Sequence, residues 1–196
     1  MWVVVGLGNP GKRYAATRHN VGFRVSDRLA SSWAVDVLRK AHQACVGEAR
    51  RGDQRVLLVK PQTFMNDSGN AVASVKRFYR FPADQLVAVH DDVDLEVGRV
   101  RIRKGGSGGG NRGIASMIAT LDDPGFIRVK VGIGRPPAGA VPASYVLGVP
   151  HGPEARRLEH AEARAADAVE QVLVHGVERA MNRINQRETD HGGPPL

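Results

Sequence analysis

A histidine and a pair of carboxylates are the side chains of this sequence best suited to acid–base chemistry. His19 lies in a polar stretch just before an apolar helical pattern, and Asp91 and Asp92 follow a short apolar run. A carboxylate that accepts a hydrogen bond from an imidazole fixes the tautomer of the ring and raises its basicity. No serine or cysteine carries the signature of a catalytic nucleophile. We therefore expect a His–Asp pair that activates water directly; a solvated or helix-capping His19 is the structural alternative.

The same acidic cluster could instead bind a metal ion. His90, Asp91, Asp92 and Asp94 follow closely after the apolar run at 86–89. Adjacent residues on an extended segment point to opposite sides, so these side chains cannot all face one ion unless the chain turns sharply. We expect no metal and no cofactor, and a metal site stays open as the alternative.

Three glycines near the N-terminus, Gly6-x-Gly8-x-x-Gly11, match the dinucleotide-binding fingerprint and follow an apolar run. That fingerprint needs a helix to begin within it, so that the helix N-terminus can hold a pyrophosphate. Pro10 instead makes Asn9 extended, and the segment that follows has no apolar helical period. We interpret the glycines as shaping a loop that presents Asn9. A nucleotide-dependent oxidoreductase is the alternative.

A second glycine-rich loop, between residues 104 and 113, offers bare backbone N–H groups among many cations. Such a loop can wrap a phosphate, and a helix after it adds the positive end of its dipole. A flexible hairpin connection is the structural alternative. The cations around the loop favour an anion: Arg99, Arg101, Arg103, Lys104, Arg112 and Arg128. The side chains expected to contact phosphate are Arg103, Lys104, Arg112 and Lys130.

The overall charge also favours a polyanionic partner. The chain has 28 Lys and Arg against 20 Asp and Glu, a formal net charge of +8, and such an excess attracts nucleic acid. The single cysteine, Cys45, excludes an internal disulfide, is expected to be half-buried, and is typical of a reducing compartment. No window approaches 18 apolar residues, and no secretory pattern opens the chain. We expect a cytoplasmic protein that does not enter a membrane.

Strands and helices must bring these loops together, because α/β sheets place ligands at the loops that follow their strands. Apolar runs predict strands at 2–5, 55–59, 86–89, 100–103 and 128–133. Helical patterns predict helices at 20–32, 67–79, 114–121 and 153–186, the last divided at Gly176, with a loop over 134–150.

Alternating strands and helices are typical of an α/β domain. We predict one globular catalytic domain, residues 1–187, with a mixed twisted β-sheet and helices on both faces. The inward–outward alternation at 100–103 indicates an antiparallel member of that sheet. Residues 188–196 are expected to be a flexible tail.

Four segments together resemble the bacterial peptidyl-tRNA hydrolase family. They are VVGLGNPGKRYAATRHNVGF at 4–23, KPQTFMNDSGNAV at 60–72, VHDDVDLEVGRVRIRKGGSGG at 89–109 and RVKVGIGRPP at 128–137. Each motif alone is modest, but four in this order are specific, and the resemblance spans nearly the whole chain. It implies a mixed sheet wrapped by helices and a monomeric enzyme that works without metal.

The resemblance also implies roles for matching residues. His19 matches the catalytic base, and Asp91 matches the carboxylate that stabilises its competent form. Asn9 matches the residue that distinguishes peptidyl-bearing substrates from free aminoacyl-tRNA. Four further positions match contacts to the tRNA acceptor end or the peptide: Tyr14, Phe64, Met65 and Asn66.

The glycine loop departs from the family pattern. The family usually continues Gly-His-Asn-Gly-Leu, whereas this chain reads Gly110-Asn111-Arg112-Gly113-Ile114. Asn111 and Arg112 thus occupy positions of the substrate site. An arginine binds phosphate through its fork of donors but cannot accept a hydrogen bond. We expect an active enzyme, with an RNA-binding relative that has lost catalysis as the alternative.

The expected reaction is hydrolysis of the ester that joins peptide and tRNA in peptidyl-tRNA, which recycles tRNA from stalled translation. His19, oriented by Asp91, would take a proton from the attacking water. Asn66 and nearby backbone amides are candidates for binding the oxyanion. The partner would be tRNA, through its acceptor end and phosphate backbone, and residues 138–148 would act as a mobile lid over the peptide channel.

Overall fold

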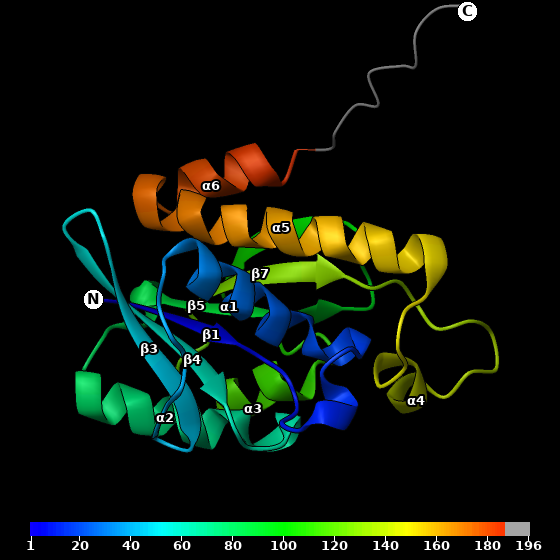
Figure 1. Cartoon of the computed structure of the whole chain (residues 1–196), viewed down its shortest axis with the longest axis horizontal. Coiled ribbons are helices and arrows are strands. Elements are labelled where there is room, and N and C mark those ends of the chain that lie inside the picture. Colours follow the sequence, from blue (N-terminus) through cyan, green and yellow to red (C-terminus); the bar gives the residue numbers. More distant parts are fainter. Residues whose placement is uncertain (187–196) are drawn as a thin grey trace, which may run out of the picture.

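The computed structural model describes residues 1–186, so the predicted tail at 188–196 lies outside the described residues. A seven-stranded sheet with the order β2-β3-β4-β1-β5-β7-β6 forms the centre of the molecule (Figure 1). Its strands are β1 (Trp2–Gly6), β2 (Arg39–Ala41), β3 (Ala44–Arg51), β4 (Gln54–Pro61), β5 (Leu86–Asp92), β6 (Val100–Lys104) and β7 (Ile127–Gly132).

The four inner strands, β4, β1, β5 and β7, run parallel to one another. Antiparallel strands flank them: β6 pairs with β7 on one side, and β3 and then β2 extend the other side. The sheet is therefore mixed, as predicted, and β6 is the antiparallel member indicated by its alternating sequence. Because the inner strands are parallel, their carboxyl ends meet at one edge of the sheet, where ligands bind in such folds.

Helices cover both faces of the sheet (Figure 1). One face carries α1 (Val21–Ser32), α5 (Gly152–His175) and α6 (Val177–Ile184), and the other carries α2 (Ser68–Tyr79) and α3 (Arg112–Leu121). The short α4 (Pro142–Val146) lies apart from both layers, beside the carboxyl ends of the strands. Single 3₁₀ turns occupy loops at Lys12–Tyr14, Arg18–Asn20, Met65–Asp67 and Ala83–Gln85.

Strand alternation sorts the apolar side chains into two cores. Val4 of β1 packs with the buried stripes of α1 and α5, whereas Val3 and Val5 pack with those of α2 and α3. The apolar stripes of α1 (Phe23, Val25, Leu29) and α5 (Leu158, Ala165, Val172) are buried, and Gly176 divides α5 from α6 as expected. Near the end of α2, the half-buried Tyr79 faces the core, while Phe78 is 69% exposed.

The hairpin of β2 and β3 was absent from the sequence prediction. β3 has a mixed sequence, ACVGEARR, and its outer half is exposed. The turn that joins the two strands places His42 and Gln43 at positive φ, a conformation that glycine or asparagine usually signals. Neither the apolar period nor the turn chemistry therefore marks this hairpin.

Two boundaries and one loop differ from the prediction in ways that affect the site. β5 continues through Asp92, so the acidic residues belong to the strand itself, and α3 begins at Arg112 rather than at Ile114. The predicted loop at 134–150 contains α4, whose five residues begin at a proline suited to the first helical turn. Asp67 precedes α2, but its side chain makes no capping hydrogen bond.

Candidate active site

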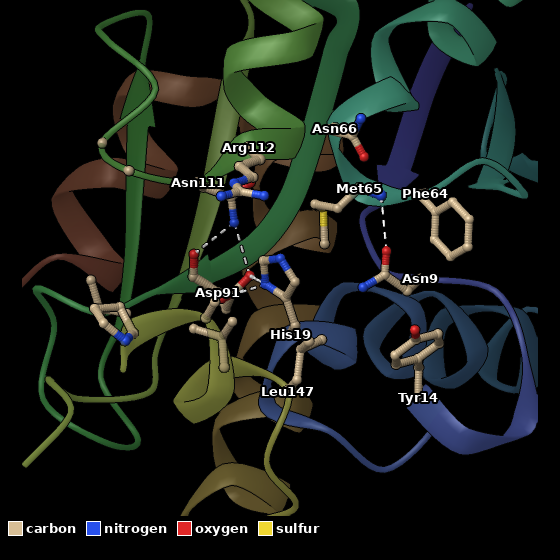
Figure 2. A pocket seen from close by; sticks show the side chains of 16 residues that line it. Asn9, Tyr14, His19, Phe64, Met65, Asn66, Asp91, Asn111, Arg112 and Leu147 are labelled. Carbon is tan, nitrogen blue, oxygen red and sulfur yellow. Dashed lines mark hydrogen bonds and ion pairs between the residues drawn. The ribbon is translucent and has the colours of Figure 1, made fainter. Parts of the chain in front are cut away.

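A cavity of about 480 Å³ opens at the carboxyl ends of the parallel strands. The segment after β1 contributes Asn9, Tyr14 and His19 to its wall, and the segment after β4 contributes Phe64, Met65 and Asn66. Asp91 at the end of β5 and Asn111 and Arg112 at the start of α3 complete this part of the lining (Figure 2). Nine of the twelve predicted site residues thus meet in one pocket. Arg103, Lys104 and Lys130 lie outside it.

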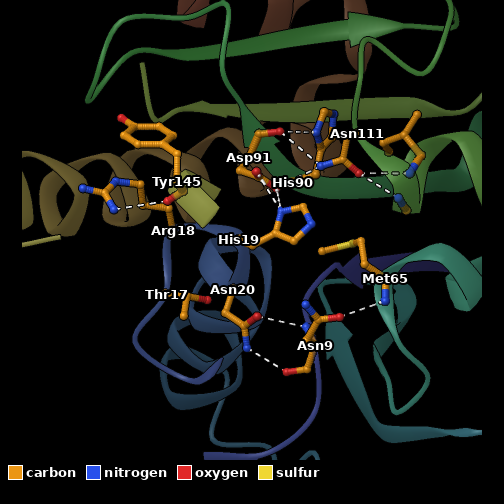
Figure 3. Close-up of polar contacts among 12 residues, drawn as sticks. Asn9, Thr17, Arg18, His19, Asn20, Met65, His90, Asp91, Asn111 and Tyr145 are labelled. Atoms are coloured by element: carbon orange, nitrogen blue, oxygen red, sulfur yellow. Dashed lines mark hydrogen bonds and ion pairs between the residues drawn. The ribbon is translucent and has the colours of Figure 1, made fainter. Parts of the chain in front are cut away.

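His19 and Asp91 are in direct contact at the floor of the pocket. The Nδ1 atom of His19 lies 2.9 Å from each carboxylate oxygen of Asp91, and the two residues are 9% and 4% exposed. A carboxylate accepts, so Nδ1 carries the proton and Nε2 is left as the basic nitrogen. Figure 3 shows that edge of the ring directed away from Asp91, toward the side where Met65 and Asn9 lie.

The Asn9 side chain is held by its oxygen, and among residues 1–186 its amide nitrogen has no hydrogen-bond partner. Asn9 Oδ1 accepts a hydrogen bond from the backbone N–H of Met65 at 2.9 Å. A backbone N–H can only donate, so the oxygen must face Met65, and the NH₂ group faces the pocket that Asn9 lines. Asn9 therefore offers N–H donors to anything that enters.

Asn20, absent from the sequence prediction, holds the backbone of Asn9. Its Oδ1 accepts from the Asn9 backbone N–H, and its Nδ2 donates to the Asn9 carbonyl, both at 2.9 Å. Asn20 is 1% exposed. The sequence signal that could have identified Asn20 is its position next to His19, at the expected start of α1.

Asn111 is the N-cap of α3 and also reaches Asp91. Its Oδ1 accepts from the backbone N–H groups of Gly113 and Ile114, and its Nδ2 lies 2.9 Å from Asp91 Oδ1. Gly113 leaves room for Met65, because a Cβ at this position would lie 2.5 Å from the Met65 sulfur and the side chain would have to shift. The start of α3 is therefore packed tightly against the pocket.

The predicted phosphate-binding cations fall into separate groups. The β6–β7 register and the strand alternation place Arg103 and Lys130 on the sheet face of α2 and α3, and Lys104 on the opposite face. Lys130 forms an ion pair with Asp92. Burial raises the pKa of the Asp92 carboxyl, but Lys130 and the Asp94 backbone N–H outweigh that effect and hold the pKa below its ordinary value.

Arg128 supports the glycine loop from beneath. Its guanidinium is buried and donates to the carbonyls of Gly106 and Ser107, and burial lowers its pKa. The loop contains the letters Gly-x-Ser-x-Gly around Ser107, but α3 begins only at Arg112. Ser107 is therefore not on the tight strand-to-helix turn of a nucleophile elbow. It is also exposed and does not line the pocket.

The predicted lid segment forms one wall of the pocket. Pro142, Ala143, Val146 and Leu147 line the cavity, and Leu147 is 40% exposed. Three hydrogen bonds attach the segment to its surroundings. The Tyr145 hydroxyl donates to the Ile133 carbonyl at 2.6 Å, the Tyr145 carbonyl accepts from Arg18 Nη1 at 3.3 Å, and the Gly148 carbonyl accepts from the Arg18 backbone N–H at 3.0 Å. An apolar wall of this kind suits the side chains of a peptide.

Comparison with known proteins decides the family. The peptidyl-tRNA hydrolase family model matches residues 3–191. A peptidyl-tRNA hydrolase of Anaeromyxobacter dehalogenans is 46% identical over 187 residues, which cover 95% of this chain and 97% of that one. One from Alkaliphilus metalliredigens is 43% identical over 185 residues, which cover 94% of this chain and 100% of that one.

The chain belongs to the peptidyl-tRNA hydrolase family. The fold agrees, since the crystal structure of the peptidyl-tRNA hydrolase of Acinetobacter baumannii is similar with a TM-score of 0.89 and 32% identity, covering 94% of each chain. A peptidyl-tRNA hydrolase solved in complex with N-propanol gives a TM-score of 0.90 at 31% identity, covering 96% of each chain. Within residues 1–186 of this peptidyl-tRNA hydrolase family member, no helix is long and apolar enough to span a bilayer.

Proposed function

We propose that this protein hydrolyses the ester between the peptide and the 3′ ribose of peptidyl-tRNA, with His19 as general base. The observation that carries the proposal is the contact of His19 Nδ1 with the Asp91 carboxylate at 2.9 Å. That contact leaves Nε2 as a base at the pocket, and Nε2 has no hydrogen-bond partner among residues 1–186. The pocket is complete within one chain, which supports action as a monomer.

The reaction follows from this geometry. A water molecule at Nε2 attacks the ester carbonyl and gives its proton to His19, and Asp91 stabilises the imidazolium that forms. Collapse of the tetrahedral intermediate breaks the bond to the ribose oxygen, which takes the proton from His19. The products are a peptide with a free carboxylate and a tRNA with its 3′ hydroxyl restored. General base catalysis of this kind contributes about 10²–10⁴ in rate.

Selection of the blocked substrate follows from the orientation of Asn9. Its pocket-facing NH₂ can only donate, so it fits the carbonyl oxygen of the acyl group that blocks the amino acid. A free aminoacyl ester presents an ammonium group there, which brings donors against donors and leaves the amide unpaired. Asn66 at the rim is a candidate donor to the developing oxyanion. The exposed aromatic ring of Phe64 is a candidate stacking surface for the terminal base.

Binding of tRNA would rest on phosphate contacts, because one enzyme must serve tRNAs of every sequence. The charge of +8 supports this. Arg112 at the pocket and Arg103 and Lys130 on the β6–β7 face are the side chains we favour, and Lys104 would contribute from the opposite face. A tRNA substrate and a single cysteine favour the cytoplasm as its location.

The test uses purified N-acetyl-aminoacyl-tRNA, with the unblocked aminoacyl-tRNA as the substrate control. The wild-type protein should release free tRNA from the blocked form and leave the unblocked form intact. His19→Ala should abolish release while it retains tRNA binding in a filter assay. Turnover by His19→Ala at the wild-type rate would remove His19 as the base, and a wild-type protein without activity would support the RNA-binding alternative.

A further inference from the structure

We propose that Asn111 is a positioning residue that holds the Asp91 carboxylate against His19, rather than a residue that binds substrate. The inference rests on the proposed function, since it concerns the base of that reaction. It arises from the contacts of a residue at which this chain departs from the family pattern, and it assigns separate tasks to Asn111 and its neighbour Arg112.

The first step is the orientation of the Asn111 amide, which the backbone determines. Asn111 Oδ1 lies 3.0 Å from the Gly113 nitrogen and 3.1 Å from the Ile114 nitrogen. Both of these groups are backbone N–H donors, so the amide oxygen must face them. The nitrogen, Nδ2, is therefore directed at Asp91 (Figure 3), 2.9 Å from its Oδ1 and 3.3 Å from its carbonyl oxygen.

The second step is the effect on Asp91. One of its carboxylate oxygens, Oδ1, accepts from both His19 Nδ1 and Asn111 Nδ2, each at 2.9 Å. Two N–H donors on the same oxygen stabilise the ionised carboxylate and fix its direction. An asparagine does not titrate in the range where enzymes work, so this donor is present at every pH. Asn111 thereby acts on the reaction through Asp91.

The third step is that the polar groups of Asn111 are already occupied, whereas those of Arg112 are available to a ligand. Asn111 is 7% exposed, and its amide hydrogens and its oxygen are engaged with the protein. Arg112 is exposed at the pocket rim and makes no hydrogen bond or ion pair within residues 1–186. Contact with the substrate therefore falls to Arg112, and Asn111 has no group left to offer.

Two substitutions separate the donor from the helix cap. Asn111→Asp is isosteric and Asn111→Ser is uncharged; both keep an oxygen that caps α3, and neither places an N–H on Asp91. We expect kcat to fall about 10- to 100-fold in both, as for loss of a hydrogen bond to a charged group, with KM within about threefold. Asn182→Asp, on the exposed surface of α6, is the matched control and should behave as wild type.

The pH profile distinguishes positioning from a merely structural role. Without the donor, the Asp91 carboxylate loses one of its two N–H partners, and the acid limb of kcat/KM should lie at higher pH than in the wild type. For Asn111→Ser a thermal midpoint within about 3 °C of wild type is expected, because the cap is kept; Asn111→Asp also brings a second carboxylate against Asp91, so its midpoint should be lower. Wild-type kcat with an unmoved limb, or a loss of activity that only follows unfolding, would overturn the proposal. An inactive wild-type protein would instead refute the proposed function.

Discussion

Arg18 and Glu154, 136 positions apart in the sequence, form a bidentate ion pair beside the pocket. Nε and Nη2 of Arg18 each donate to a different oxygen of Glu154 over 2.7 Å, and this hydrogen bonding raises the pKa of the guanidinium. The guanidinium also lies 4.4 Å from the ring centroid of Tyr145. Arg18 precedes His19 directly, so the turn that carries the base is bound to α4 and to the start of α5.

Glu154→Gln tests whether this pair holds the α4 wall in place. The variant keeps its size but loses the charge-assisted contact, so α4 should be held less firmly. We expect KM to rise about three- to tenfold while kcat changes less than twofold. Glu159→Gln on the same helix is the control, since Glu159 is 68% exposed and lies 3.6 Å from Arg28. Equal KM values for the two variants would show that the pair does not support the wall.

Asp91→Asn tests the orientation of the base. The amide is isosteric, but it can donate to His19 and thereby favour the wrong tautomer, with the proton on Nε2. We expect kcat to fall by about 10²–10⁴, as in other orienting carboxylates, while the circular dichroism spectrum is unchanged. Asp94→Asn removes a nearby exposed carboxylate that pairs with Arg135 and should leave kcat unaltered. A loss of less than threefold in Asp91→Asn would rule out an orienting role.

Asn9→Asp tests the basis of substrate selection. The variant keeps an oxygen for the Met65 N–H, but it replaces the pocket-facing donors with negative charge. Hydrolysis of N-acetyl-aminoacyl-tRNA should fall at least about tenfold in kcat/KM. The unblocked ester should be disfavoured less, because its ammonium group now meets a carboxylate. The ratio of the two kcat/KM values is the measurement, and an unchanged ratio would contradict the role given to Asn9.

Arg103→Gln tests the phosphate contact on the β6–β7 face. Each neutralised phosphate contributes to the slope of log affinity against log salt, so this variant should lower the slope by about 1. Lys104→Gln is the neighbouring comparison and should change the slope less, because Lys104 points to the opposite face. Fluorescence titration of tRNA from low to moderate salt gives both slopes. Identical slopes in wild type and Arg103→Gln would show that Arg103 does not contact a phosphate.

His90→Gln tests a pH dependence of stability. Burial lowers the pKa of His90 from 6.5 to about 4. Below pH 6.5 the unfolded chain therefore binds a proton that the folded protein does not, so the free energy of unfolding should decrease as pH falls toward 4, by about 3 kcal/mol over the window. Urea denaturation at pH 7 and pH 5 should show a smaller decrease in the variant. An equal decrease in both proteins would assign the effect to other groups.

The fold and much of the pocket could be predicted because they depend on strong local patterns. Parallel strands with apolar runs bring the ends of β1, β4 and β5 together, so the loops that carry Asn9, Met65 and Asp91 had to meet at one edge. The resemblance to the family then supplied roles for the residues in those loops. The contact between His19 and Asp91 follows from these two kinds of information together.

The missed features depend on contacts that local sequence does not encode. Asn20 holds Asn9 across a loop, and Arg128 reaches back to carbonyls that precede it by about twenty residues. Asn111 was predicted to contact the substrate, and it does line the pocket; its contacts with Gly113 and Asp91, which local sequence does not show, are the new observation. Lys104 was grouped with Arg103 because they are adjacent, and strand alternation separates them. Each of these contacts joins segments whose relative position is known only from the folded structure.

The support that Arg128 gives to the glycine loop has a consequence for the conformational entropy of that loop. Glycine loses more conformational freedom than any other residue when it is ordered, and residues 105–110 contain five glycines. Because Arg128 holds the carbonyls of Gly106 and Ser107, part of this conformational freedom is already lost in the folded protein, and less would remain to be lost when a ligand orders the loop. Arg128 itself is 3% exposed, so its substitution would loosen the loop without removing a surface cation.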